Sequence, residues 1–152
     1  MSAPKRALLG FVAAVIAVLI FHQGTSALLN ASGVPTVAPY GMNPVPPFGV
    51  PMLVNRCFWG GLYGLALGLA LPWLPRAPMW VLGLSFGLLS VLIGWFVVAP
   101  AKGLPVGGGF IPARMLTTIV INGVWGIGIG LVLSLLMRKA SVGAKVHARG
   151  AA

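Results

Sequence analysis

The sequence predicts an all-α integral membrane protein with four transmembrane helices, arranged as two tandem hairpins. Of its 152 residues, 59% are hydrophobic, and the mean hydropathy is +1.02. Charged residues make up only 7%, whereas soluble domains carry about 25% and need them to cover a water-facing surface. Four separate apolar stretches are long enough to cross about 30 Å of hydrocarbon at about 1.5 Å per helical residue.

The first expected span covers about residues 7–31 and contains an uninterrupted apolar block at 11–21. Lys5 and Arg6 before it would also suit a signal peptide, but Thr25-Ser26-Ala27 is a poor match to a cleavage site. We expect this helix to be retained, because the internal repeat described below requires it.

A proline-rich segment, 32–51, follows the first span. Its six prolines exclude a helix or a central strand, because proline lacks a backbone N–H and fixes φ. We therefore expect a stiff, extended lid of the polyproline type on the outer, periplasmic side.

The second and third spans are expected at about 52–71 and 79–98. Pro51 and Pro78 precede them, at the first helical turn, where a missing N–H is tolerated. The turn between the two spans, 72–78, is too short for anything but an antiparallel connection.

The third span is expected to end before Pro100, and a glycine-rich, flexible loop then leads to Pro112. The fourth span covers about 113–137. Residues 138–152 would form a basic cytoplasmic tail, so that the whole chain is a single transmembrane domain.

The basic residues predict the orientation of the spans. Arg56, Lys102 and Arg114 lie on one side of the expected bundle. By the positive-inside rule both termini are cytoplasmic, as an even number of spans requires. We expect a multi-pass protein of the bacterial inner membrane, in contact with anionic lipids. The other seven of the ten basic residues lie on the side of the termini: Lys5, Arg6, Arg76, Arg138, Lys139, Lys145 and Arg149.

The second and fourth spans match each other and indicate an internal duplication. Trp59-Gly60 aligns with Trp125-Gly126, so each unit would be one hairpin, repeated in the same orientation. A chance match between residues that are common in membrane helices is the alternative. Small residues at every fourth position predict close helix packing, within the chain or between copies of it, at Gly60, Gly64, Gly68, Gly126 and Gly130.

Polar residues inside the spans predict one candidate site. Counted from the cytoplasmic ends, His22, Arg56 and Asn122 each lie 15 residues in, about 22 Å from the inner edge. Trp95 takes the place of His22 in the repeat alignment. We expect these four residues to line an outward-facing cavity for a small anionic or polar ligand. The arginine would supply charge, the asparagine hydrogen bonds and the tryptophan an apolar wall.

Each of these residues also has an ordinary role. Arg56 would extend to the outer headgroups, and Asn122 and the neighbouring Gln23 would hydrogen-bond between helices. Lys102 and Arg114 would add positive charge near the cavity. We expect no metal and no cofactor, because the chain has one cysteine and two histidines, of which one lies in a span.

The absence of Asp and Glu excludes large classes of function. The chain cannot form a paired-carboxylate hydrolase, a Ser-His-Asp triad, a carboxylate-bound Mg²⁺ or Ca²⁺ site or an acidic proton relay. A net charge of +10 would attract anionic lipids or an acidic membrane partner, and we expect no nucleic-acid binding.

Several segments resemble those of small proteobacterial inner-membrane proteins with four predicted helices, a group without an established activity. These are FHQG at 21–24, PFGVP at 47–51, FWGG at 58–61 and NGVWG at 122–126. The resemblance covers about residues 7–137. It implies the same membrane location and topology, and it supplies no mechanism and no site residues.

Three classes of function remain. The sequence favours a non-catalytic accessory or structural subunit of a larger membrane assembly, because the parts outside the spans are small. The alternative is a small oligomeric transporter or channel for an anionic or neutral solute, supported by the duplicated hairpin. A membrane enzyme is the third class, and we expect none, because no carboxylate is present to orient His22 as a base.

Overall fold

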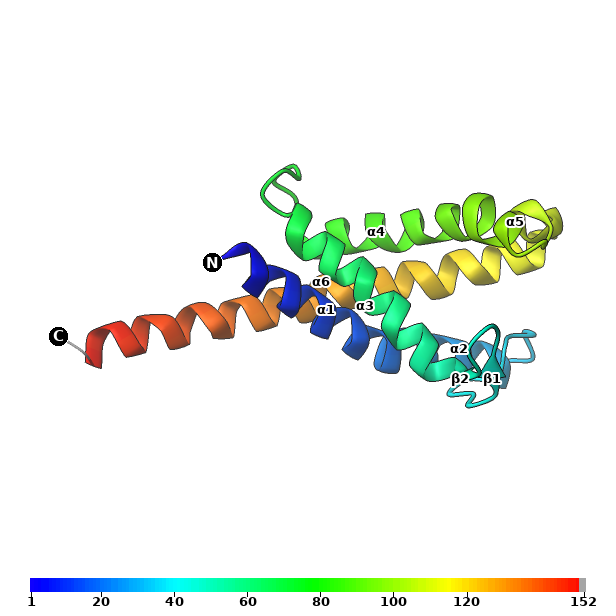
Figure 1. The fold of residues 1–152 in the computed structure, drawn as a ribbon, viewed down its shortest axis with the longest axis horizontal. Helices are drawn as coiled ribbons and strands as arrows, with labels where there is room; N and C mark the ends of the chain where they lie inside the picture. Colours follow the sequence, from blue (N-terminus) through cyan, green and yellow to red (C-terminus); the bar gives the residue numbers. More distant parts are fainter. Residues whose placement is uncertain (151–152) are drawn as a thin grey trace.

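A computed structural model describes the backbone of residues 1–150 and the side chains of residues 1–141 (Figure 1). The described chain is helical in four stretches, joined by three loops. In chain order the elements are α1 (Ala3–Ala17), η1 (Val18–His22), α2 (Gln23–Ala31), β1 (Pro44–Val45), β2 (Val50–Pro51), α3 (Met52–Ala70), α4 (Met79–Ile93), η2 (Gly94–Val98), α5 (Ala99–Ala101), η3 (Val106–Phe110) and α6 (Pro112–Gly150).

Three of these stretches, within the described residues, are long and apolar enough to cross a membrane: Ala3–Ala31, Met79–Ala101 and Pro112–Ser141. The expected second span, 52–71, corresponds to α3. This helix has 19 residues, which is long enough, but Asn55, Arg56 and its glycines lower its mean hydropathy. The protein is therefore all-helical in its main elements, with three helices that are long and apolar enough to cross a membrane and a fourth, of 19 residues, that is less apolar.

The helices lie side by side in the order α3, α1, α6, α4. α1 packs along α3, α4 packs along α6, and α1 and α6 form the contact between these two pairs. α3 and α4 hardly contact each other, and they diverge from the short loop that joins them (Figure 1). Both termini and this loop lie at one end of the molecule, called the terminal end below. Segments 32–51 and 102–111 lie at the opposite end, called the lid end.

Glycines allow the paired helices to approach at backbone distance. Gly10 of α1 faces Gly64 of α3, and a Cβ atom on either would collide with the backbone oxygen of the other. Gly83 of α4 lies in the same way against Gly126 and Gly130 of α6. Lipid provides no hydrophobic drive between helices, so such close contacts supply the packing energy.

The other glycines expected at helix contacts are also buried. A Cβ atom at Gly60 would lie 2.7 Å from Val18 and 3.2 Å from Trp125. A Cβ atom at Gly68 would collide with the backbone of Arg6. Because all of these neighbours belong to the same chain, the glycines pack the helices of one molecule against each other.

The lid segment 32–51 is folded back onto the first helical stretch. The Tyr40 hydroxyl donates a hydrogen bond to the backbone oxygen of Leu19 at 2.9 Å, within the π-helical turn η1. The backbone N–H of Tyr40 donates to the side-chain oxygen of Gln23, also at 2.9 Å. These two hydrogen bonds attach the middle of the lid to the helix below it.

The expectation of an extended polyproline lid is wrong over its second half. There β1 and β2 pair antiparallel, with Pro44 opposite Pro51 and Val45 opposite Val50. Gly49, with φ of 66°, allows the chain to reverse between the two strands. The hairpin consists of two-residue strands, so its prolines do not interrupt a longer ladder.

The expected end of the third span is also corrected. Pro100 lies inside α5 rather than beyond the helix end, directly after the π-helical turn η2. The loop that follows contains the turn η3. Its residues Gly107, Gly108 and Gly109 have φ of 62°, 65° and 77°, a left-handed conformation that glycine adopts without strain.

The last helix is longer than the expected span 113–137. α6 continues to Gly150 and projects beyond the other helices at the terminal end (Figure 1). The side chains of 142–150, and residues 151 and 152, lie outside the described part of the expected basic tail.

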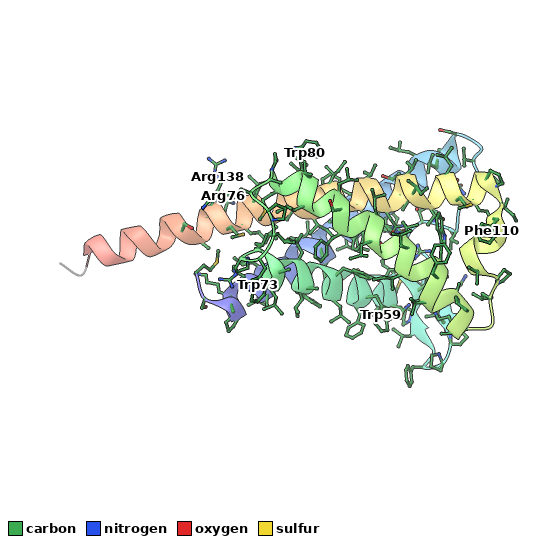
Figure 2. The ribbon with its side chains drawn as sticks, turned by 90° about the horizontal axis from the view of Figure 1, so that it is seen from above. Trp59, Trp73, Arg76, Trp80, Phe110 and Arg138 are labelled. Carbon is green, nitrogen blue, oxygen red and sulfur yellow. The ribbon has the colours of Figure 1, made fainter. Side chains whose placement is uncertain are left out.

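Exposed aromatic and basic side chains mark the two ends of the bundle. Trp73, Arg76, Trp80 and Arg138 lie toward the terminal end, whereas Trp59 and Phe110 lie nearer the lid end (Figure 2). Aromatic groups at two levels, separated by exposed apolar side chains, are typical of a surface that crosses a bilayer.

Candidate functional site

A cavity of about 580 Å³ lies at the lid end of the bundle, between the two helix pairs. The four residues named as site candidates from the sequence all line it: His22, Arg56, Trp95 and Asn122. Pockets that bind small molecules usually measure about 300–1,000 Å³, so a small solute fits. We call this space the upper cavity.

The wall residues come from all four helical stretches. Arg56 lies in the second turn of α3, and Asn122 lies on α6. His22 closes the π-helical turn η1, and Trp95 belongs to the π-helical turn η2. Single π-helical turns inside longer helices occur frequently at functional sites.

The charge on the cavity wall has one sign. Arg114 lines the upper cavity together with Arg56, whereas Lys102, which was expected nearby, does not line it. Arg56 is half-buried and Arg114 is exposed at the rim. The chain contains no Asp or Glu that could pair with either side chain. Two guanidinium groups without a carboxylate partner form an environment that favours anions.

Asn122 connects α6 with α4 at the floor of the upper cavity. Its side-chain N–H₂ donates to the backbone oxygen of Thr118 at 2.9 Å. The hydroxyl of Ser90 on α4 donates to Gly87 O at 2.7 Å and also reaches the side-chain oxygen of Asn122 at 3.4 Å. Gln23 was expected to bond between helices, but its oxygen accepts from the lid residue Tyr40 instead.

Two buried polar atoms have no hydrogen-bond partner within the described residues: Nδ1 of His22 and Nε2 of Gln23. Such atoms are uncommon, because a buried polar group without a partner costs about 1–3 kcal/mol. His22 lines the upper cavity with its ring, although the Nδ1 atom itself is buried.

A second, smaller cavity of about 160 Å³ adjoins the first and is called the lower cavity here. It shares His22, Arg56 and Asn122 with the upper cavity. Its remaining wall is mostly apolar and aromatic, with Val18, Trp59, Gly60, Tyr63, Ser90 and Trp125. The rings of Tyr63 and Trp125 meet edge to face, with centroids 6.1 Å apart and planes at 87°.

Sequence reasoning placed Arg114 near the cavity but missed Thr118 and several other wall residues, although the residues on α6 share a recognisable signal. Arg114, Thr118 and Asn122 are spaced four apart, which places them on one face of α6. All three line the upper cavity. Thr36 and Gly108 also line it, but they come from the lid and from η3, and no sequence pattern places such loop residues.

The described residues contain no group of three His or Cys side chains that could hold a metal ion. Cys57, next to Arg56 on α3, carries a free thiol and is partly exposed. The arrangement suits the binding of an anion better than metal chemistry, because its charged groups are cations.

No protein-family model, curated protein or solved structure matches this sequence. The arguments below therefore rest on the two cavities and on the composition of the chain.

Proposed function

We propose that this chain is a non-catalytic membrane protein that binds a small anion in the upper cavity. One observation carries the proposal: Arg56 and Arg114 line the same cavity in a chain that has no Asp or Glu. Hydrogen bonds between a guanidinium and an anionic oxygen are stronger than neutral ones, and more so where water is partly excluded.

The wall residues have separate roles in this proposal. Arg56 binds the anion with two parallel N–H donors, and Arg114 at the rim attracts it into the cavity. Asn122 and His22 offer neutral hydrogen bonds that fix the orientation of the ligand. Trp95 forms an apolar wall of the kind that small-molecule pockets commonly have.

We also propose four membrane spans, with both termini on the cytoplasmic side of a bacterial inner membrane. α3 supports the fourth span, because it runs from the lid end to the terminal end alongside α1 (Figure 1). Lys5, Arg6 and Arg76 support the orientation, since they belong to the terminal end. In this orientation the upper cavity opens toward the periplasm.

Binding an anion from the periplasmic side is the first step of uptake, so the proposed protein is a small transporter or channel for an anionic solute. Coupling to protons through a carboxylate is excluded by the composition. Uptake would therefore follow the concentration gradient of the solute, because a membrane potential that is negative inside opposes the entry of an anion.

An accessory subunit of a larger membrane assembly is the second candidate. The projecting end of α6 favours it, because it extends beyond the bundle and the sequence there is basic. Purification in mild detergent distinguishes the two candidates. A heteromeric complex supports the accessory subunit, and a monomer or homo-oligomer supports the transporter.

The binding proposal is tested by calorimetric titration with inorganic phosphate, on protein in nanodiscs of phosphatidylcholine at low salt. Arg56→Gln should raise the Kd about tenfold, because a hydrogen bond to a charged group contributes about 1.5–3 kcal/mol and each 1.4 kcal/mol is tenfold. Arg114→Gln should raise it less, about threefold, because the exposed rim is screened by solvent.

Arg138→Gln is the matched control. Arg138 is exposed on α6 toward the terminal end and does not line either cavity. The Arg138→Gln variant should bind phosphate with the same affinity as the unmodified protein. Equal affinity of all three variants, or no binding by the unmodified protein, would overturn the proposal.

A further inference from the structure

The two cavities differ sharply in chemistry although they share a wall. The upper cavity carries two arginines and several polar side chains, whereas the lower cavity is lined mainly by aromatic and apolar groups. His22, Arg56 and Asn122 belong to both walls and therefore lie where the cavities adjoin. A single ligand that occupies both must have an anionic part and an apolar part, joined at this level.

The lower cavity lies between α3 and α4, with η1 and α6 beneath it. Its wall takes Trp59 and Tyr63 from α3, Ser90 from α4 and Trp125 from α6. α3 and α4 hardly contact each other and diverge toward the lid end (Figure 1). Trp59 lines the lower cavity and is 56% exposed, so the cavity reaches the outer surface of the bundle there. The lower cavity is thus reachable from the lipid side of the bundle.

The size of the lower cavity limits what it can hold. An apolar cavity of about 150 Å³ holds a benzene-sized molecule. The lower cavity, at about 160 Å³, therefore has room for a short length of hydrocarbon. Its one small polar side chain, Ser90, already donates to the backbone of Gly87 and does not require a polar ligand.

We infer that the ligand is a phosphate monoester of a hydrocarbon chain, with its phosphate in the upper cavity and the first part of its chain in the lower cavity. This inference rests on the proposed anion binding and names the class of solute. A phosphate dianion matches the two guanidinium groups, which bind it in a planar, paired manner. The hydrocarbon chain of the ligand enters from the bilayer between α3 and α4.

The inference is tested by comparing methyl phosphate with butyl and hexyl phosphate, titrated into the protein in phosphatidylcholine nanodiscs. Empty nanodiscs correct for partition of the ligands into lipid. Affinity should rise along the series, with hexyl phosphate at least tenfold tighter than methyl phosphate, because each buried methylene group adds hydrophobic free energy. This measurement uses the unmodified protein and does not depend on a variant that folds.

A substitution on α4 distinguishes the contribution of the lower cavity to binding from that of the upper cavity. Ser90→Leu fills the lower cavity and should remove the advantage of hexyl phosphate while methyl phosphate still binds. Ser85→Leu is the control, because Ser85 is exposed on the same helix and lines neither cavity.

The outcomes distinguish this inference from the proposal on which it rests. Equal affinity for methyl and hexyl phosphate in the unmodified protein would overturn the inference and leave anion binding intact. Retention of the full chain-length effect in Ser90→Leu would also overturn it, because the effect would then come from the bilayer and not from the lower cavity. If no phosphate ester and no inorganic phosphate binds, both proposals fail.

Discussion

Arg56 occupies a position where a cation is costly. It lies in the second turn of α3, among apolar residues of a helix that packs along α1. A charged side chain at the centre of a membrane helix costs about 2.5–3.5 kcal/mol, and less nearer the interface. In the proposed binding role, Arg56 is held in place at this cost. Replacing it with an apolar residue should therefore stabilise the protein without ligand.

We therefore predict opposite effects of Arg56→Leu on stability and on binding. The variant should lose phosphate binding. Without ligand it should unfold at a higher temperature, because its unfolding free energy should rise by about 1–2 kcal/mol, which is less than the cost of a charge at the bilayer centre. Arg138→Leu, at the terminal end, should change neither property. Thermal unfolding in detergent measures the first effect. Loss of expression in Arg56→Leu would mean that the residue is structural, and the transporter would lose its main support.

Two kinds of glycine occur in the helices. At some, an added methyl group would collide with a neighbouring helix, and at others it would meet nothing. A Cβ atom at Gly64 would collide with Gly10 and Ala14, and one at Gly130 would collide with the backbone of Met79. A Cβ atom at Gly94 would meet nothing within 4 Å, although this residue also lies in a helical stretch.

Gly64→Ala and Gly130→Ala should each lower the unfolding free energy, because overpacking a tight contact costs about 1–3 kcal/mol. Gly94→Ala should leave it unchanged or raise it by up to about 1 kcal/mol, since alanine favours helix over glycine. Thermal unfolding of the three variants in one detergent measures the difference. Similar melting of all three would show that close contact at these glycines does not stabilise the bundle.

At the scale of elements, the lid is attached to the first helical stretch through Tyr40 and also through Thr36, whose hydroxyl donates to the backbone oxygen of Ser26 at 3.3 Å. The Tyr40 hydroxyl reaches the π-helical turn η1, where the backbone oxygen of Leu19 accepts its hydrogen bond. The lid residues 35–37 lie on the wall of the upper cavity next to this attachment. Detaching the lid should therefore alter access to the cavity more than it alters the helix bundle.

Tyr40→Phe should increase hydrogen exchange of the lid amides and loosen phosphate binding about threefold or less. A neutral hydrogen bond of this kind contributes about 0.5–1.5 kcal/mol. Tyr63→Phe is the comparison for the exchange measurement alone, because Tyr63 lies on α3 outside the lid and lines the lower cavity. Unchanged exchange at 34–43 in Tyr40→Phe would mean that the lid is held by other contacts.

The level of the helical site residues along the bundle could be predicted from the sequence. The loop residues that line the cavity could not. Counting residues placed His22, Arg56 and Asn122 at one level because the rise of an α-helix is constant. The same count gives no direction around the helix axis, which the glycine contacts decide instead. Thr36 and Gly108 reach the cavity through the lid and through η3, whose folds depend on contacts distant in sequence.

At the scale of the whole molecule, both helix pairs pack through glycine-to-glycine contacts, but the contacts differ by one helical turn when the pairs are aligned by the repeat. Gly10 lies against Gly64 in one pair, and Gly83 lies against Gly126 in the other. The repeat alignment, however, matches Gly64 with Gly130, which is four residues later. The pairs are therefore similar in architecture but displaced by one helical turn in register.

The proposed topology predicts where fused reporters are active. Alkaline phosphatase, which folds only outside the cytoplasm, should be active when inserted within 36–46 and inactive when fused after Lys145. A fluorescent protein that folds in the cytoplasm should show the reverse pattern at the same two positions. Phosphatase activity at the C-terminal fusion would rule out the four-span arrangement.

The central contact of the bundle joins the first helical stretch to the last one. Ribosomes synthesise α1 and α3 long before α6, so the first pair must wait in the bilayer without its permanent neighbour. During that interval Ala13, Ala17 and Val18, which are buried in the finished protein, border on lipid or on the insertion machinery. In the proposed four-span topology, Arg56 enters the membrane before Asn122 and Arg114 are synthesised. Insertion of the final helix then completes both the core and the proposed binding cavity.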